Sequence, residues 1–162
     1  MQTNLVPEVV AEADGDELSL GGLEDLLGFH LRRAQAAMYR HFVAALAKLE
    51  LTQRQFAVLE LLNANPGASQ VDLAGILTLD RPAVMTVIDR LEERRLVIRQ
   101  RSRSDRRRQE IRLTETGSEL LLNARKLVRR HDARFTSRFS KAETQVLIGA
   151  LKRVYRDVRV ET

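Results

Sequence analysis

Arginine is concentrated in one short stretch of the sequence, between positions 94 and 112. The stretch holds nine arginines against two acids, Asp105 and Glu110. A guanidinium group forms paired hydrogen bonds with phosphate oxygens or with the O6 and N7 edge of guanine. Because so dense a charge repels itself unless a polyanion neutralises it, the stretch predicts a nucleic-acid contact, with a solvated charged loop as the alternative. The arginines are Arg94, Arg95, Arg99, Arg101, Arg103, Arg106, Arg107, Arg108 and Arg112.

A second set of candidate residues lies on a helix predicted from Asp80 onward. Its apolar positions, Val84, Val87, Ile88 and Leu91, form one stripe at helical spacing. Residues off this stripe can enter a DNA major groove, where arginine recognises guanine and Ala or Thr contacts the thymine methyl group. The alternative is an ordinary solvent-facing surface. The DNA contacts expected from this helix and from the arginine-rich stretch are Arg81, Pro82, Ala83, Met85, Thr86, Arg90, Arg101, Arg103, Arg106, Arg107 and Arg108.

The hydrophobic spacing predicts the elements that must position these residues. The first helix has an apolar face so wide that it needs a second surface, which a partner chain would provide. Asp89 and Glu93 would be repelled by phosphate, so we expect them to cap helices or to pair with arginine. The expected order is a helix over 23–49, helices capped by Thr52, Ser69 and Asp80, β-strands over 97–101 and 110–114, and helices opening near Thr116 and at Lys141.

Two short helices, a recognition helix and a β-hairpin form a winged helix-turn-helix, so the fold class is mainly α with a small β-hairpin. We expect a flexible acidic lead-in over 1–20, dimerisation helices over 21–50 and 117–160, and a DNA-binding lobe over 51–116. The net charge of +5 is the sum of an acidic beginning and a strongly basic remainder of the chain. The first 25 residues hold seven of the 22 acids and no Lys or Arg, so the remainder carries a net +12.

The hairpin region also resembles the MarR family of bacterial transcriptional regulators. The family's wing pattern is Asp-x-Arg, three residues, an aliphatic residue, one residue, and then Leu-Thr-x-x-Gly. The resemblance implies a homodimer on a palindromic operator in double-stranded DNA, with Asp105 bracing the wing and Arg107 at its tip. One departure is Arg95, where the family usually has the glycine that suits a left-handed helix end. The pattern is matched at Asp105, Arg107, Ile111, Leu113, Thr114 and Gly117.

The resemblance further implies a repressor that a small effector releases from DNA. Basic groups beside aromatic ones on the first helix suggest an anionic, partly aromatic effector, and residues 30–35 resemble family members that sense aromatic acids or their CoA thioesters. A role in aromatic compound catabolism follows from that resemblance. The alternative places these residues in the dimer core and on the surface. The candidates are Phe29, His30, Arg33, Tyr39, Arg40 and Phe42, with His41 among them.

Several function classes have no support in the sequence. The chain has no cysteine and three scattered histidines, of which His131 is expected to be buried and hydrogen-bonded. We therefore expect no metal, no cofactor and no catalysis. With no long apolar run and no secretory signal, we expect a cytoplasmic protein without a membrane partner. A ligand-independent architectural DNA-binding protein and a winged-helix protein-interaction module remain alternatives.

Overall fold

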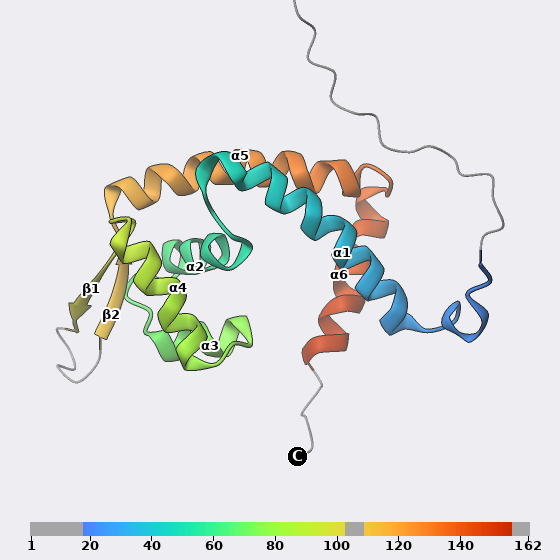
Figure 1. The fold of residues 1–162 in the computed structure, drawn as a ribbon, viewed down its shortest axis with the longest axis horizontal. Helices are drawn as coiled ribbons and strands as arrows, with labels where there is room; N and C mark the ends of the chain where they lie inside the picture. Colours follow the sequence, from blue (N-terminus) through green and yellow to red (C-terminus); the bar gives the residue numbers. More distant parts are fainter. Residues whose placement is uncertain (1–17, 103–108, 157–162) are drawn as a thin grey trace, which may run out of the picture. The chain divides into compact units, whose positions relative to one another are not determined.

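The computed structural model describes residues 18–102 and 109–156 of the chain (Figure 1). Internal contacts divide the chain into two units, Met1–Gln35 and Ala36–Thr162. Helix α1 (Leu27–Leu46) runs across that boundary, preceded by the short helix η1 (Gly21–Leu23) and followed by η2 (Ala47–Leu49). The single helix predicted over 23–49 is therefore wrong at both ends, because tighter 3-10 turns replace α-helix there. None of the helices in the described part of the chain is long and apolar enough to cross a membrane.

The second unit contains the predicted winged helix-turn-helix, which Figure 1 shows as α2, α3 and α4 grouped beside the hairpin. The hairpin is antiparallel, with Val97 opposite Leu113 and Arg101 opposite Gln109. Helix α5 contacts both α2 and β2. The elements of this unit after α1 and η2 are α2 (Gln53–Ala64), α3 (Gln70–Leu77), α4 (Arg81–Glu93), β1 (Val97–Arg101), β2 (Gln109–Leu113), α5 (Glu115–Thr136) and α6 (Lys141–Arg156).

Side-chain caps fix where the helices of the second unit begin. Thr52 and Ser69 each form a reciprocal capping box with the residue three positions later, and Asp80 accepts a hydrogen bond from the Ala83 N–H at 2.7 Å. These confirm the three predicted N-caps. The start predicted for α5 near Thr116 is slightly late. Thr114 accepts from the Gly117 N–H at 2.9 Å, so the helix begins at Glu115.

The hydrophobic core of the second unit determines which face of α4 points outward. The predicted stripe is buried, with Val84, Ile88 and Leu91 fully inaccessible and Val87 9% exposed. Helix α4 contacts α2, α3 and β1, so neighbouring elements surround its inner side. The residues between the stripe positions are therefore left for solvent or for a ligand. The apolar stripe of α4 shares the core with Val58, Leu59, Leu62, Leu73, Val97, Ile111 and Leu121.

Helix α4 ends in a Schellman motif in which Arg95 occupies the left-handed position, with φ of 57°. The Leu96 N–H bonds to the Leu91 carbonyl at 2.9 Å, and the Arg95 N–H bonds to the Glu92 carbonyl at 2.8 Å. Arg95 thus adopts the left-handed conformation that glycine adopts without strain. A residue with a Cβ atom pays about 1–2 kcal/mol in this conformation.

The start of α5 lies directly against the chain that leaves α4. A Cβ atom placed on Gly117 would be 2.0 Å from the carbonyl oxygen of Leu96. The same carbonyl accepts a hydrogen bond from the Thr114 N–H at 3.1 Å, and the Thr114 hydroxyl donates to the Arg95 carbonyl at 2.7 Å. Glycine at 117 is thus required by a backbone-to-backbone approach.

Replacing Gly117 by alanine should separate this junction and lower the free energy of unfolding by about 2–3 kcal/mol, the upper range for an overpacked site. The measurement is urea denaturation followed by circular dichroism. Gly75→Ala is the matched control, because nothing lies within 4 Å of a Cβ at that helical glycine and the change should be neutral or stabilising by up to ~1 kcal/mol. Equal stability of the two variants would contradict the close approach.

Replacing Arg95 by glycine should raise the free energy of unfolding by about 0.5–1 kcal/mol. Glycine relieves the strain of the left-handed conformation in the folded state. This stabilises the protein by more than the extra conformational freedom of glycine stabilises the unfolded chain. Arg95→Ala removes the same exposed side chain but keeps the strain, so it serves as the control. A glycine variant no more stable than the alanine variant would show that the conformation carries no strain.

Candidate nucleic-acid interface

The outward face of α4 presents most of the side chains expected to contact DNA. Arg81, Pro82 and Arg90 are exposed, and Met85 is 45% exposed. Thr86 is also exposed, and its hydroxyl donates to the Pro82 carbonyl at 3.0 Å. That hydrogen bond occupies the hydroxyl proton within the helix, so the methyl group is what Thr86 can offer to a thymine.

Ala83 differs from its neighbours on α4 because it is half-buried. Its N–H is held by the cap from Asp80, in the first turn of the helix. The methyl group of Ala83 is therefore only partly available to a DNA base. It lies one turn from the exposed Thr86, at the end of α4 that a major-groove helix usually directs at base edges.

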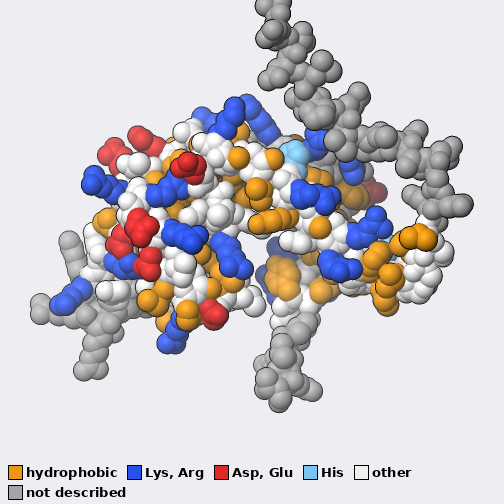
Figure 2. All heavy atoms as spheres, viewed as in Figure 1, with side chains coloured by type: hydrophobic (Ala, Val, Ile, Leu, Met, Phe, Trp, Pro, Cys, Tyr) orange, Lys and Arg blue, Asp and Glu red, His pale blue; other side chains and the backbone are white. Residues whose placement is uncertain are grey.

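Acidic residues at the far end of α4 are neutralised from the hairpin. The guanidinium of Arg99 on β1 forms ion pairs with both Asp89 and Glu92, and the Arg99 N–H also bonds to Glu92 at 3.3 Å. The predicted pairing of Asp89 is confirmed. The second partner is Glu92 and not the exposed Glu93, because Glu92 is one helical turn on from Asp89 and lies beside β1. Acidic and basic side chains accordingly lie next to one another beside the hairpin in Figure 2.

The hairpin base carries one further expected contact, Arg101, which is exposed at the end of β1. On β2, Arg112 pairs with Glu110 at 2.9 Å. The expected contacts Arg103, Arg106, Arg107 and Arg108, and the bracing residue Asp105, lie outside the residues that the structure describes. Their roles at the tip of the wing stay predictions.

Two arginines that the sequence did not single out join α4 and α5 to other elements. Arg94, counted above only as part of the charged stretch, donates to the carbonyl of Glu50 at 2.7 Å and to that of Leu49 at 3.0 Å. Arg125 forms two hydrogen bonds of 2.7 Å with the carboxylate of Glu60, which raise its pKa. Their partners are 44 to 65 positions away, so no local pattern could have revealed them.

The candidate effector residues of the first unit form a compact arginine–aromatic group. The guanidinium carbons of Arg32 and Arg33 lie 6.0 and 5.6 Å from the centre of the Phe29 ring. The His30 ring meets the Phe29 ring edge-on at 5.5 Å, and His30 Nε2 is 2.7 Å from the Glu24 carbonyl oxygen. Two cations beside an aromatic face can attract an anion and stack a flat ring.

Of the candidate effector residues in the second unit, some lie at the surface and one lies in the core. Tyr39 is 46% exposed and Arg40 is exposed, whereas Phe42 is 7% exposed and packs edge-on against Phe56 and His131. The Phe42 ring is thus a core contact within one chain. Tyr39 and Arg40 are accessible to a partner or a ligand.

His131 is buried and hydrogen-bonded, as predicted. Its Nδ1 lies 2.8 Å from Nδ1 of His41, and both rings contact Phe135. Burial lowers the pKa of His131, and the nearby His41 lowers it further, while Asp132 opposes this. The pair therefore holds α1 against α5, and the lowered pKa favours the neutral form of His131. No group of His, Asp and Glu in the described ranges could hold a metal ion.

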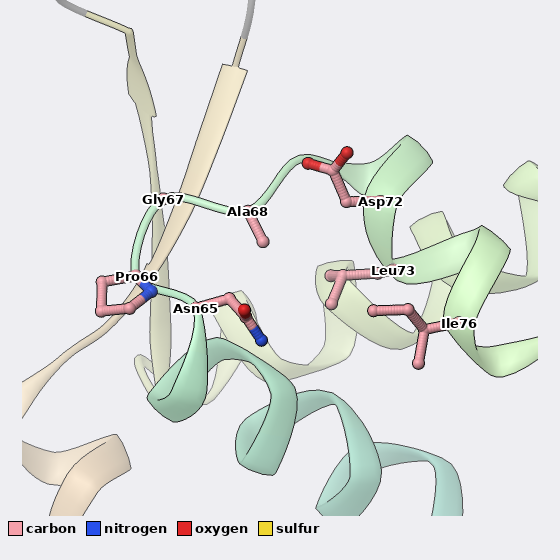
Figure 3. A pocket seen from close by; sticks show the side chains of 7 residues that line it. All are labelled: Asn65, Pro66, Gly67, Ala68, Asp72, Leu73 and Ile76. Atoms are coloured by element: carbon pink, nitrogen blue, oxygen red, sulfur yellow. The ribbon is translucent and has the colours of Figure 1, made fainter.

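A hollow of about 400 Å³ opens between the end of α2 and α3 (Figure 3). In Figure 3, Asn65, Leu73 and Ile76 line it from the two helices, and Gly67 and Ala68 close one side. None of the candidate effector residues borders it. The hollow is therefore separate from the residues that the sequence predicted for the effector.

Comparisons with a family model and with known proteins point to the same kind of protein. The MarR family model matches residues 51–108. A Thauera aromatica protein named as a transcriptional regulatory protein for the hcr operon is 40% identical over 147 residues, which is 90% of this chain and 89% of that protein.

Solved structures of similar proteins include a complex with DNA and a complex with a small molecule. The transcriptional repressor CouR bound to a 23-mer DNA duplex matches with a TM-score of 0.82 and 40% identity, over 86% of this chain and 99% of that chain. CouR from Rhodococcus jostii RHA1 bound to p-coumaroyl-CoA matches with a TM-score of 0.79 and 29% identity, over 86% and 98%. The chain therefore belongs to the MarR family of winged helix-turn-helix transcriptional regulators.

Proposed function

We propose that this protein is a homodimeric repressor that binds a palindromic operator and is released from it by an aromatic acyl-CoA thioester or a related aromatic acid. The observation that carries the DNA-binding part is the outward face of α4, with Arg81 and Arg90 exposed at opposite ends of a helix whose other face is buried. A helix held in this way can lie in a major groove without losing core contacts.

In this proposal α4 reads bases and the hairpin contacts the backbone. Arg81 and Arg90 bind guanine edges or phosphates, with Pro82, Ala83, Met85 and Thr86 as apolar contacts between them. Arg101 and the wing arginines Arg103, Arg106, Arg107 and Arg108 add phosphate or minor-groove contacts, with Asp105 bracing the wing. We propose the same domain boundaries as above: a lead-in over 1–20, dimerisation helices over 21–50 and 117–160, and a DNA-binding lobe over 51–116.

The effector class rests on two supports. One is the similarity to CouR, a repressor whose solved structures include one with p-coumaroyl-CoA. The other is the group formed by Phe29, Arg32 and Arg33, which offers an aromatic face and two cations. A CoA thioester carries phosphates for the cations and flat rings for the aromatic side chain. Residues proposed to contact the effector are Phe29, His30 and Arg33 in the first unit and, as a separate group, Tyr39 and Arg40 in the second. Phe42, which the sequence also suggested, lies in the core.

The proposed role requires neither catalysis nor a cofactor, and it places the protein in the cytoplasm, where a bacterial operator is found. Relatives of this chain are transcriptional regulators and not enzymes. An architectural DNA-binding protein would bind unrelated duplexes equally and ignore the effector. A protein-interaction module would not bind DNA in the presence of competitor duplex.

Replacing Arg81 or Arg90 by alanine should weaken binding to a duplex selected by this protein from a random-sequence library. Loss of a bidentate guanine contact costs about 1–3 kcal/mol, which is a 5- to 150-fold weaker Kd and a relaxed base preference at one position. Loss of a phosphate contact instead reduces the slope of log K against log salt by about 0.9. Fluorescence anisotropy over a salt series separates the two.

The control for these variants is Arg54→Ala, which removes an exposed arginine from α2, outside the proposed interface. It should leave both affinity and salt slope unchanged. If Arg81→Ala and Arg90→Ala behave like Arg54→Ala, α4 is not the helix that reads DNA.

Adding p-coumaroyl-CoA should raise the melting temperature of the protein and weaken its binding to the selected duplex. Arg33→Gln should weaken p-coumaroyl-CoA binding about 10-fold, because it removes one charge-assisted contact with an anion. Isothermal titration gives the affinity, with free CoA and p-coumarate as separate titrants. Duplex binding that none of the three compounds alters would favour the architectural protein.

A further inference from the structure

Helix α4 is fastened at its C-terminal end to the segment that ends α1. Arg94 follows the last residue of α4, and its guanidinium reaches back across the fold. Its Nη1 donates to the Glu50 carbonyl at 2.7 Å and its Nη2 donates to the Leu49 carbonyl at 3.0 Å. Leu49 is the last residue of η2, which continues directly from α1. One side chain thus joins the end of the recognition helix to the end of the long N-terminal helix.

The two carbonyls are natural acceptors for a cation. The last carbonyls of a helix have no partner within the helix, and the helix dipole makes that end negative. Glu50 adopts a left-handed conformation, with φ of 50°, which ends the helix there. Arg94 therefore supplies, from a distant element, donors for two further carbonyls at this helix end.

The geometry of this contact fixes orientation as well as distance. The apolar stripe of α4 packs through contacts that lack the directionality of hydrogen bonds, so its orientation there is set by close packing alone. A planar guanidinium bound to two successive carbonyls through two different nitrogens tolerates little sliding or rotation. Arg94 is thus a directional contact between the end of α4 and the end of α1, in addition to the packing of the shared core.

The segments on both sides of the contact are held by hydrogen bonds and by burial. On one side, the Schellman motif at Arg95 and Leu96 holds the end of α4. On the other, Leu51 is buried and the capping box between Thr52 and Gln55 starts α2 immediately. A displacement at the end of α1 therefore cannot be absorbed by a loose linker before it reaches Arg94.

We propose that Arg94 is a positioning residue that couples the C-terminal end of α1 to the orientation of the recognition helix, so that α1 and bound DNA influence one another through this contact. The inference rests on the proposed function, since it requires α4 to be the helix that binds DNA. Coupling of this kind is reciprocal, so operator binding must change the end of α1 just as α1 changes operator binding.

The reciprocal effect is tested by hydrogen–deuterium exchange of the full chain, with and without saturating selected duplex. In the wild type, the duplex should slow exchange in α4 and also in the peptide over 47–52. In Arg94→Gln, the slowing over 47–52 should fall to less than half while that of α4 persists. Arg94→Lys, which keeps the charge but cannot span both carbonyls, should give an intermediate result and covers the case in which Arg94→Gln does not fold.

Two matched controls separate coupling from stability and charge. Arg125→Gln breaks another arginine contact between elements, the pair with Glu60 that joins α5 to α2. Lys48→Gln removes a positive charge from the same η2 turn, where Lys48 is exposed. Both should keep the slowing over 47–52. Slowing that persists in Arg94→Gln, or that is absent from the wild type while α4 is slowed, would overturn the proposal.

A second readout is the factor by which p-coumaroyl-CoA changes the Kd for the duplex. This factor should shrink at least threefold in Arg94→Gln and stay unchanged in Arg125→Gln, whereas a purely structural role would lower affinity and leave the factor intact. If the wild type binds the duplex but ignores p-coumaroyl-CoA, the effector assignment fails and the exchange result still decides the role of Arg94. If no duplex binds, the proposed function fails, and this inference fails with it.

Discussion

The chain between α4 and β1 is the constraint on which the second unit depends. Within four residues it ends the recognition helix, turns through a left-handed position and enters the hairpin. Leu96 is the centre of this junction, since its carbonyl accepts from Thr114 and touches Gly117. Arg94 adds the end of α1 on the other side. Because α1, α4, the hairpin and α5 all meet there, the position of the outward face of α4 depends on a few backbone contacts.

Two groups of arginines can be told apart once their neighbours are known. Arg94, Arg99 and Arg125 bond to carbonyls or carboxylates of other elements, whereas Arg112 pairs with Glu110 on its own strand. Those on the outward face of α4 remain accessible. The pairing of Arg99 also shields two acids that would otherwise repel phosphate. Positive charge in this protein therefore has two roles, fixing elements to one another and attracting a polyanion.

Much of the architecture could be predicted because it depends on local chemistry. Side-chain caps at Thr52, Ser69 and Asp80 and the apolar stripe of α4 involve residues within a few positions of one another. The helix ends were predicted less well, at α1 and α5, because 3-10 turns and hydrogen bonds from neighbouring segments compete there with α-helix. Of the candidate site, the face of α4 could be predicted from periodicity. The wing arginines could be singled out from their density and the effector candidates from basic groups beside aromatic ones, whereas the roles of Asp105 and Arg107 and the release by an effector rest on resemblance to the family.

The sequence by itself determined the order of elements, the face of α4 that is left outward and the unusual residue at position 95. Only the tertiary structure decided which arginines are used internally, that Phe42 is a core residue, and that His41 and His131 meet. The physical reason is the distance along the sequence over which each interaction acts. Caps and helical periodicity act over three or four residues, whereas Arg94 and Arg125 find their partners 44 to 65 positions away, which only the folded chain brings together.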